Sequence, residues 1–331
     1  MEFKLPDLSS IYKEKQPQHV KVLILGSGPA GLSAALYAAR AELAPLVLTG
    51  TALGGQASLT HTIENYPGFP DGLGGVELGE LFQKQAERFG ARFEFDLAKQ
   101  VDLSARPFRI LSDNGVVYRA DTLIVATGAS PNHLNVPGEE LLTGRGVSYC
   151  GTCDGWFFKD RKVVVVGGGD SALEEGIFLT RFASSVTIVH RRDQLRAGAI
   201  LQSRARQNPK INFIFDTLLT QIAGEGKVES VRLKHAKTGE ESDFAADGVF
   251  IFIGHTPNTA LFSGQIDMDE NGYIITDKMM QTNIPGVFAA GEVNDPHFRQ
   301  VVTSAGMGAA AAIQATRFLE ENEEPQPVVD A

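Results

Sequence analysis

The two cysteines of this 331-residue chain stand close together, in the segment Cys150-Gly151-Thr152-Cys153. A Cys-x-x-Cys pair is either half of a zinc site or a redox dithiol that closes a small disulfide ring. A zinc site would need two further ligands, and the chain has no other cysteine and no histidines at the usual paired spacing. Because a neighbouring thiol lowers the pKa of the attacking one, the spacing favours a redox pair, and we expect no metal site.

Asp154 directly follows the second cysteine. A carboxyl group beside a dithiol is a candidate proton donor or acceptor, so we expect Asp154 to act in catalysis with Cys150 and Cys153. The structural alternative is that Asp154 caps a helix N-terminus. The sequence is compatible with both interpretations.

Two glycine-rich turns each follow an apolar strand and precede a helical pattern. They are Gly26-Ser27-Gly28-Pro29-Ala30-Gly31 and Gly167-Gly168-Gly169-Asp170-Ser171-Ala172. In such a turn the first glycine permits the tight bend, the second lets the backbone approach a pyrophosphate, and the third position packs the helix against the strand. Because the required context is present twice, the sequence predicts two dinucleotide sites rather than two ordinary turns.

Basic residues follow the second strand of the second unit. Where an acidic residue would bind the ribose of NAD, the sequence has His190-Arg191-Arg192, with Arg196 nearby. Cations fit a 2′-phosphate, so the predicted nucleotide is NADPH, against the alternative of a solvated basic loop. The matching place in the first unit, residues 49–50, is Thr-Gly and does not specify the nucleotide there.

The elements that must position these residues alternate strand and helix, which predicts an α/β fold with parallel sheets. The same strand–helix–strand unit occurs twice, so we expect two nested Rossmann-like dinucleotide-binding domains. The second is inserted in a discontinuous first domain, because crossovers marked by proline and glycine occur near 131–138 and 255–258. The expected strands are 20–25, 45–49, 162–166 and 186–189, and the expected helices end near 41, span 172–182 and span 303–320.

The expected domain boundaries follow from these crossovers. The first domain comprises 20–130 and 256–320, the inserted domain with the cysteines is 131–255, and 1–19 and 321–331 are tails. A hydrophobic share of 43% rules out a disordered chain, and the net charge of −10 argues against nucleic acid or an anionic membrane as the main partner. No apolar stretch reaches membrane-spanning length and no signal peptide precedes the first strand, so we expect a cytoplasmic protein.

In this order the motifs resemble the low-molecular-weight, bacterial-type thioredoxin reductases, which are class II pyridine nucleotide-disulfide oxidoreductases. The resemblance covers residues 20–320. It implies a homodimeric enzyme with FAD on the first domain and NADPH and the disulfide on the inserted one. The motifs are GSGPAG (26–31), LGGQ (53–56), ENYPGFP (64–70), ATGAS (126–130), YCGTCDG (149–155), GGGDSALEEG (167–176), HRRDQLRA (190–197), GHTPNT (254–259), GVFAAGEV (286–293) and RQVVTSAGMGAAAA (299–312).

The resemblance also implies which residues bind each nucleotide. For FAD these are Gly26, Ser27, Gly28, Pro29, Ala30 and Gly31 at the pyrophosphate, Gly55, Gln56 and Asn65 near the flavin, Ala126 in the Ala-Thr-Gly turn, and Gly291, Glu292, Arg299, Gln300 and Val301 over the isoalloxazine. For NADPH they are Gly169, Asp170, Ser171, His190, Arg191, Arg192 and Arg196. One position departs from the family, which usually has aspartate where this chain has Glu292.

The implied activity is that of an NADPH-dependent thioredoxin-disulfide reductase. Hydride passes from NADPH to FAD, electrons pass to a Cys150–Cys153 disulfide, and the dithiol reduces oxidised thioredoxin. The family moves its inserted domain by a large rotation, whose hinges would fall near 128–133 and 254–259. Two alternatives are a reductase of another disulfide or peroxidase-type protein and a non-catalytic flavin- or zinc-binding protein. The sequence leaves open which cysteine attacks thioredoxin.

Overall fold

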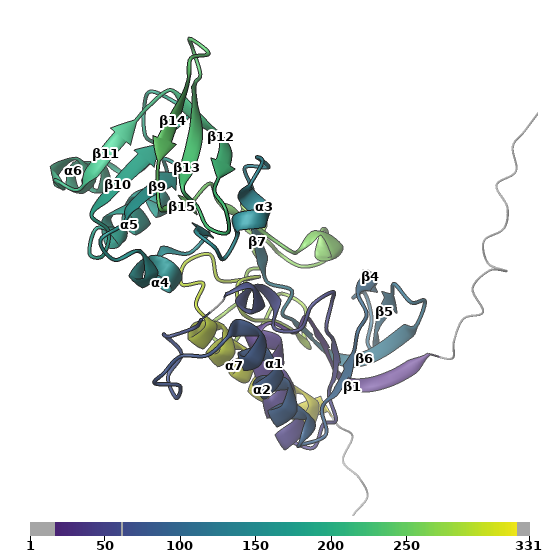
Figure 1. Ribbon diagram of the computed structural model, residues 1–331. Helices are drawn as coiled ribbons and strands as arrows, with labels where there is room; N and C mark the ends of the chain where they lie inside the picture. Colours follow the sequence, from purple (N-terminus) through teal and green to yellow (C-terminus); the bar gives the residue numbers. More distant parts are fainter. Residues whose placement is uncertain (1–16, 61, 323–331) are drawn as a thin grey trace, which may run out of the picture. The chain divides into compact units, whose positions relative to one another are not determined.

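The computed structural model describes residues 17–60 and 62–322 of the chain. These residues form two compact units. The first runs up to Ser130 and resumes at Pro257, and the second spans Pro131–Thr256 (Figure 1).

The first unit is built on a seven-stranded sheet with the order β3-β2-β1-β6-β5-β4, in which β17 also pairs with β6. Val22, Leu23 and Ile24 of the central strand are fully buried, as expected for a parallel strand that is covered on both faces. The parallel strands are β1 (Gln18–Leu25), β2 (Leu46–Leu48), β3 (Arg92–Glu94), β6 (Val117–Val125) and β17 (Val287–Ala289), and the antiparallel ones are β4 (Ala98–Asp102) and β5 (Phe108–Ser112).

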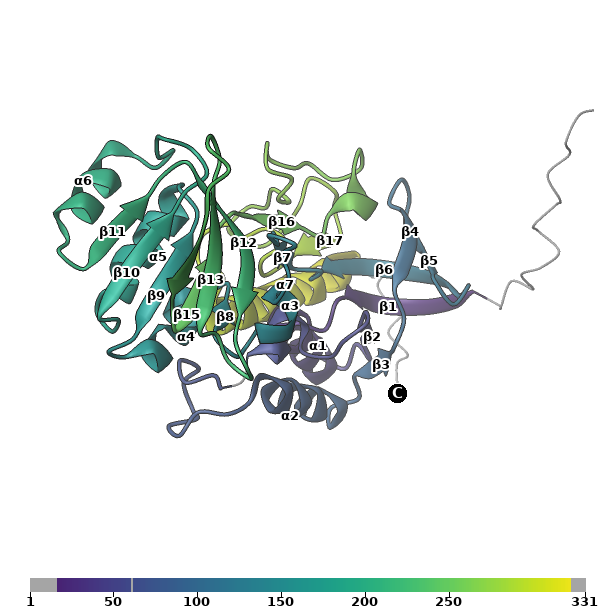
Figure 2. The same cartoon turned by 45° about the horizontal axis from the view of Figure 1, so that its top comes forward.

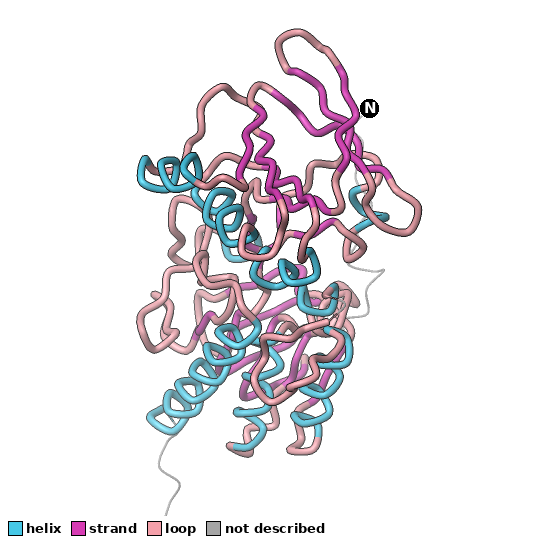
Figure 3. The backbone as a smooth tube through the Cα atoms, turned by 60° about the vertical axis from the view of Figure 1, so that its left-hand side comes forward, coloured by secondary structure: helices cyan, strands magenta, loops and turns pink. Residues whose placement is uncertain are grey.

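Three helices gather on one face of this sheet, namely α1 (Pro29–Arg40), α2 (Gly75–Glu87) and α7 (Val301–Asn322) (Figures 2 and 3). Alanines on α1 and α7 let these helices lie close together over Val22 and Ile24. At Gly308 a Cβ atom would lie 2.0 Å from the backbone oxygen of Ala30, so only glycine fits there.

The second unit has a five-stranded parallel sheet with the order β11-β10-β9-β15-β8. One face packs against α5 (Asp170–Leu179) and α6 (Ala199–Gln207), and the other against a three-stranded antiparallel sheet. The parallel strands are β8 (Val147–Ser148), β9 (Lys162–Val166), β10 (Ser185–Val189), β11 (Ile211–Ile214) and β15 (Gly248–Ile251), and the antiparallel ones are β12 (Thr217–Ala223), β13 (Ser230–His235) and β14 (Glu241–Ala245).

Short elements complete the chain. The two crossovers between the units are β7 (Ala129–Pro131) and β16 (His255–Pro257), which pair with each other. Three more carry or flank site residues: α3 (Glu139–Leu142), α4 (Gly151–Asp154) and η3 (Gly155–Phe158). The remaining two are η2 (Gly55–Leu59) and η4 (Ala260–Phe262).

The predicted α/β alternation is confirmed, and the strand expected at 162–166 has the bounds of β9. The expected tail 1–19 is wrong at its end, because Gln18 and His19 pair with β6 and belong to β1. Similarly, α7 continues to Asn322, past the expected end of the domain at 320. Residues 1–16 and 323–331 of the two expected tails lie outside the described residues. Within the described part of the chain, no helix is both long enough and apolar enough to span a membrane.

Candidate active site

The first glycine turn leaves open backbone space at a helix N-terminus. Helix α1 begins at Pro29, and no side chain caps it. Gly26 has a φ of +107°, and a Cβ there would lie 2.3 Å from the backbone oxygen of Ala126, so the packing of the chain itself requires glycine. At Gly28, by contrast, a Cβ would meet no atom of the described residues within 4 Å. The free N–H groups and this open space suit a phosphate group.

Other predicted flavin residues lie around this turn, all in the first unit. The Gly54 N–H donates to the Ser27 carbonyl over 2.9 Å, and a Cβ at Gly55 would lie 3.0 Å from the Cα of Gly28. A Cβ at Gly291 would lie 2.9 Å from the Cβ of Ala30. The structure therefore brings three motifs, at 26–31, 53–56 and 286–293, into contact. Gln56 follows Gly55 with an exposed side chain.

A second group of predicted flavin residues is joined by side-chain contacts. Asn65 donates through Nδ2 to Oε1 of Gln300 over 3.2 Å. Asp295, which the sequence did not single out, is buried and accepts from the backbone N–H groups of His297 and Phe298. It also accepts from the N–H of Arg299, which precedes Gln300 and Val301, the first residue of α7. Asp295 thus shapes the loop that presents these predicted residues.

Glu292, the departure from the family pattern, is partly buried. Burial raises the pKa of its carboxyl group, the nearby Arg299 lowers it, and Asp295 raises it, with a net upward shift. The carboxyl group of Glu292 therefore holds its proton more readily than that of an exposed glutamate.

The second glycine turn repeats the geometry of the first. Helix α5 begins at Asp170 with Gly169 before it and no side-chain cap. Gly167 has a φ of +153°, and a Cβ there would lie 2.4 Å from the backbone oxygen of Phe252. Around Gly169 a Cβ would find only one atom within 4 Å, the Nη2 of Arg196 at that distance. Ser171 is exposed on the first turn of the helix.

The predicted basic loop folds back onto this turn. The Arg196 N–H donates to the Gly168 carbonyl over 2.7 Å, and the Gly198 N–H donates to Oδ1 of Asp170 over 2.8 Å. The buried His190 ring lies against Gly168, whose Cβ would be 2.4 Å from it. Burial lowers the pKa of His190, so the imidazole is neutral at pH 7, and its Nε2 has no partner among the described residues.

Arg191 and Arg192 are exposed beside His190. Among the described residues no ion pair joins either guanidinium to a carboxylate. Asp193, the acidic residue next to them, is instead 3.9 Å from Lys237. The structure thus brings the glycine turn and the basic loop of the second unit together.

Cys150 and Cys153 form a disulfide in the second unit, with sulfurs 1.98 Å apart and Cα atoms 5.3 Å apart. Cys150 lies at the N-cap of α4, where its Sγ accepts from the backbone N–H of Cys153 over 3.1 Å. Because the ring is short, reduction and re-formation of the bond need only a local change at this helical turn.

Asp154 lies beside the disulfide in a partly buried position. Burial raises the pKa of its carboxyl group, and a hydrogen bond from Ser148 lowers it, with a net upward shift. Ser148 donates to Oδ2 of Asp154 over 2.6 Å and accepts from the N–H of Cys150 over 3.1 Å. Asp154 does occupy the N-cap position of η3, as the structural alternative expected, but its side chain makes no capping hydrogen bond there. The carboxyl group can therefore hold or release a proton near the dithiol.

Sequence reasoning missed two polar residues around the disulfide. Ser148 links Asp154 to Cys150, as described above, and Glu175 of α5 packs against Gly151, where a Cβ would lie 2.3 Å from its Oε2. Neither belongs to a spacing pattern that indicates chemistry. Only the fold, which sets α5 beside α4, brings Glu175 to this place.

Comparison with known proteins places this site in a family. Residues 20–308 match the family described as pyridine nucleotide-disulphide oxidoreductase. The thioredoxin reductase of Streptomyces coelicolor is 49% identical over 312 residues, covering 92% of this chain and 97% of the relative. That of Mycolicibacterium smegmatis is 50% identical over 303 residues, covering 91% and 97%.

Solved structures with a similar fold are also thioredoxin reductases. The crystal structure of thioredoxin reductase from Streptococcus pyogenes has a TM-score of 0.88 at 45% identity, covering 92% of this chain and 100% of that one. The thioredoxin reductase from Giardia duodenalis has a TM-score of 0.87 at 39% identity, covering 92% and 99%.

The chain therefore belongs to the pyridine nucleotide-disulphide oxidoreductase family. Within that family, the relatives and structures named above, which match it over nearly their whole length, are thioredoxin reductases. The predicted resemblance and the two-domain Rossmann-type α/β fold are confirmed. Membership implies flavin and nicotinamide cofactors.

Proposed function

We propose that this chain is an NADPH-dependent flavoenzyme that reduces the disulfide of oxidised thioredoxin. The observation that carries the proposal is the Cys150–Cys153 disulfide beside the partly buried Asp154. The disulfide shares its unit with a glycine turn and basic loop suited to a phosphorylated nucleotide. The thioredoxin reductases that match nearly the whole chain support the choice of partner.

In the proposal FAD binds the first unit. The residues present fit this group, because α1 is uncapped by any side chain and the space at Gly28 is open. The backbone at 26–31 would hold the pyrophosphate, and the loop with Asn65 and Gln300 would lie near the flavin. Glu292 would hydrogen-bond the ribityl chain.

In the proposal NADPH binds the second unit, with its pyrophosphate at the N-terminus of α5. The 2′-phosphate would meet Arg191, Arg192 and Arg196, and the buried His190 would support this loop from its place against Gly168. Arginine binds phosphate through paired N–H groups, which remain available here because the neighbouring Asp193 pairs with Lys237 instead. This arrangement favours NADPH over NADH.

The bound flavin supplies the two-electron step between the nicotinamide and the disulfide. When the Cys150–Cys153 bond accepts two electrons it breaks, and two protons convert both sulfurs to thiols. Asp154 is the proposed proton carrier for this exchange, since burial raises the pKa of its carboxyl group above the ordinary aspartate value. One thiolate then attacks a sulfur of oxidised thioredoxin to form a mixed disulfide. The other cysteine attacks that mixed disulfide at the enzyme's own sulfur, so the Cys150–Cys153 bond forms again and thioredoxin leaves as a dithiol.

The proposal further includes a homodimer and a cytoplasmic location. The resemblance supports the dimer, and the scarcity of cysteines supports a reducing compartment. A reductase of another disulfide protein would use the same residues, so the protein substrate is what an assay must decide.

The test is NADPH oxidation by the purified, flavin-loaded protein with oxidised thioredoxin as acceptor. We expect turnover with thioredoxin, and its loss in both Cys150→Ser and Cys153→Ser with the flavin retained. NADPH oxidation that does not depend on thioredoxin, or that survives loss of either cysteine, would contradict the proposal.

A further inference from the structure

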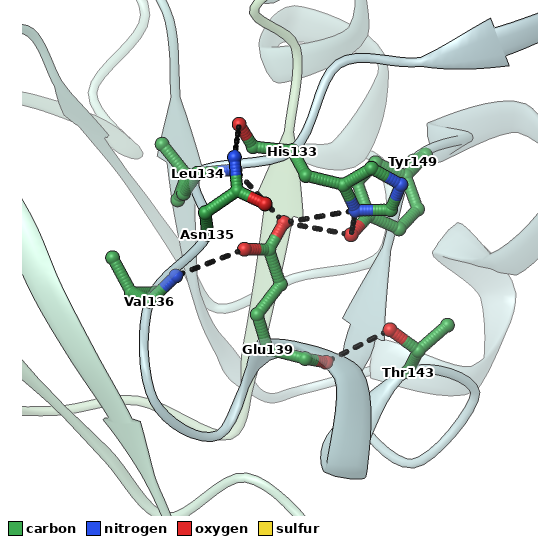
Figure 4. Close-up of polar contacts among 7 residues, drawn as sticks. All are labelled: His133, Leu134, Asn135, Val136, Glu139, Thr143 and Tyr149. Atoms are coloured by element: carbon green, nitrogen blue, oxygen red, sulfur yellow. Dashed lines mark hydrogen bonds and ion pairs between the residues drawn. The ribbon is translucent and has the colours of Figure 1, made fainter.

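A buried carboxylate joins the start of the second unit to the residue before the disulfide (Figure 4). Glu139 is 3% exposed. Its Oε1 accepts from the backbone N–H of Leu134 over 3.0 Å and from the hydroxyl of Tyr149 over 2.8 Å, and its Oε2 accepts from the N–H of Val136 over 3.3 Å. Burial raises the pKa of Glu139, and hydrogen bonds from Tyr149 and from backbone N–H groups lower it, with a net downward shift. Glu139 is therefore a carboxylate at neutral pH.

The Tyr149 hydroxyl is the centre of a directional chain of hydrogen bonds. Its oxygen lies 2.8 Å from Nδ1 of His133, which is itself 3.3 Å from Oε1 of Glu139. A phenol has one proton to donate, so when Tyr149 donates to Glu139 it accepts from the Nδ1–H of His133. Burial raises the pKa of Tyr149, so the hydroxyl keeps that proton. The two rings also meet edge-on, with centroids 5.1 Å apart.

This chain of contacts acts on the main chain that carries Cys150. Tyr149 lies between β8 and Cys150, the N-cap of α4. Ser148 accepts a hydrogen bond from the Cys150 N–H. Tyr149, the residue between them, is bonded through Glu139 to the loop 133–139, which follows the crossover strand β7. The peptide that enters Cys150 is thus fixed from two directions by side chains.

We propose that Tyr149 is a positioning residue for the redox disulfide, and that its hydroxyl, held by Glu139 and His133, keeps the backbone of Cys150 placed for bonding to Cys153. The proposal rests on the redox role proposed above for these cysteines. A disulfide forms more favourably when its thiols are held near their bonding positions, because less freedom is lost on closing the ring. Loosening Cys150 therefore favours the dithiol.

Thiol–disulfide exchange with dithiothreitol measures how favourably the Cys150–Cys153 disulfide forms. The protein dithiol loses two electrons and two protons to oxidised dithiothreitol, so an S–S bond forms between Cys150 and Cys153 while the dithiothreitol disulfide opens to two thiols. The flavin-loaded protein is equilibrated with defined ratios of the two forms and quenched with an alkylating agent. Mass spectrometry of the peptide that spans residues 150–153 then gives the oxidised fraction.

We expect Tyr149→Phe and Glu139→Gln each to lower the equilibrium constant for disulfide formation by three- to tenfold. A tenfold change corresponds to about 30 mV for this two-electron couple. The double variant should lose little more than either single variant, because both remove the same link.

The matched control is Thr180→Val. Thr180 is 9% exposed in the same unit, donates to the Ile177 carbonyl over 2.7 Å and accepts from Asn208 over 3.0 Å. Thr180→Val removes a buried hydroxyl with two hydrogen bonds, at a position that does not contact Tyr149. The free energy of unfolding should therefore fall, while the equilibrium constant for disulfide formation stays unchanged.

An equilibrium constant that is unchanged or higher in Tyr149→Phe would overturn the proposal, as would an equal fall in Thr180→Val. Tyr149→Phe removes only the hydroxyl oxygen, and thermal unfolding of the variant and the parent shows that both are folded. The measurement uses neither NADPH nor thioredoxin, so it stands whatever the thioredoxin assay shows.

Discussion

Replacing Gly28 by alanine separates the needs of the fold from the needs of the flavin. Gly28 has φ −70° and ψ 179°, which any residue adopts, and its Cβ would meet no protein atom within 4 Å. The fold should therefore tolerate the change, with a free energy of unfolding that is unaltered or higher by about 0.4–1 kcal/mol, since alanine loses less backbone entropy than glycine. The new methyl group would occupy the space proposed for the pyrophosphate.

The expected loss of affinity follows from the contacts displaced. One hydrogen bond to a charged group contributes about 1.5–3 kcal/mol, so losing one weakens FAD binding by roughly 10- to 150-fold. Flavin-free protein is titrated with FAD and the quenching of flavin fluorescence gives the dissociation constant. Denaturant unfolding of the same samples gives the stability.

Gly26→Ala is the matched control for this experiment. Its φ of +107° and the 2.3 Å approach to Ala126 predict a loss of stability in the flavin-free protein, which Gly28→Ala should not show. Unchanged FAD affinity in Gly28→Ala would refute the placement of the pyrophosphate at this turn. A large loss of stability without flavin would refute the account of open space at Gly28.

Four further outcomes follow from the second unit. Arg191→Gln combined with Arg192→Gln should raise the KM for NADPH by about tenfold or more and leave the KM for NADH nearly unchanged, because the lost hydrogen bonds are charge-assisted. Steady-state kinetics measures both KM values, with Arg181→Gln, which removes an exposed cation elsewhere in the unit, as the control. An equal rise in KM for both nucleotides would contradict the assignment. Asp154→Asn should slow disulfide reduction by roughly 10²- to 10⁴-fold, as measured by stopped-flow reoxidation of the reduced flavin, and a rate within twofold of the parent would exclude proton transfer by this group. Because the pKa of Asp154 is raised in the fold, the native state binds this proton more tightly than the unfolded chain does. In pH titrations of the free energy of unfolding, the stabilisation from this proton should be full below the ordinary aspartate pKa of 3.8 and should be lost as pH rises through the folded pKa. Ser148→Ala should move that loss to higher pH, because Ser148 lowers the pKa of Asp154, and a shift to lower pH would be inconsistent with the hydrogen bond.

Local patterns in the sequence were enough to predict the elements that carry the nucleotide turns. The valine run 163–166 made β9 recognisable, because the buried residues of a parallel strand are apolar, and the strand begins one residue earlier at the exposed Lys162. Gln18 and His19 were missed as part of β1, since polar residues at an exposed strand end have no apolar signal. Their pairing with β6 comes from residues far along the chain.

The site was predictable only where its chemistry lies in one contiguous motif. Cys150, Cys153 and Asp154 form such a motif, but whether Asp154 caps a helix or faces the thiols depends on burial and on Ser148. Asp295 was not predicted as a site residue, because it accepts hydrogen bonds from the backbone N–H groups of a loop whose shape the sequence does not specify.

The most direct test of the central claim follows the Cys150–Cys153 bond itself. The flavin-loaded protein is treated anaerobically with NADPH, then with oxidised thioredoxin, and alkylated after each step. We expect that NADPH makes both cysteines alkylatable and that oxidised thioredoxin returns them to the disulfide as thioredoxin thiols appear. A disulfide that stays closed in the presence of NADPH, or a dithiol that oxidised thioredoxin leaves unchanged, would contradict it.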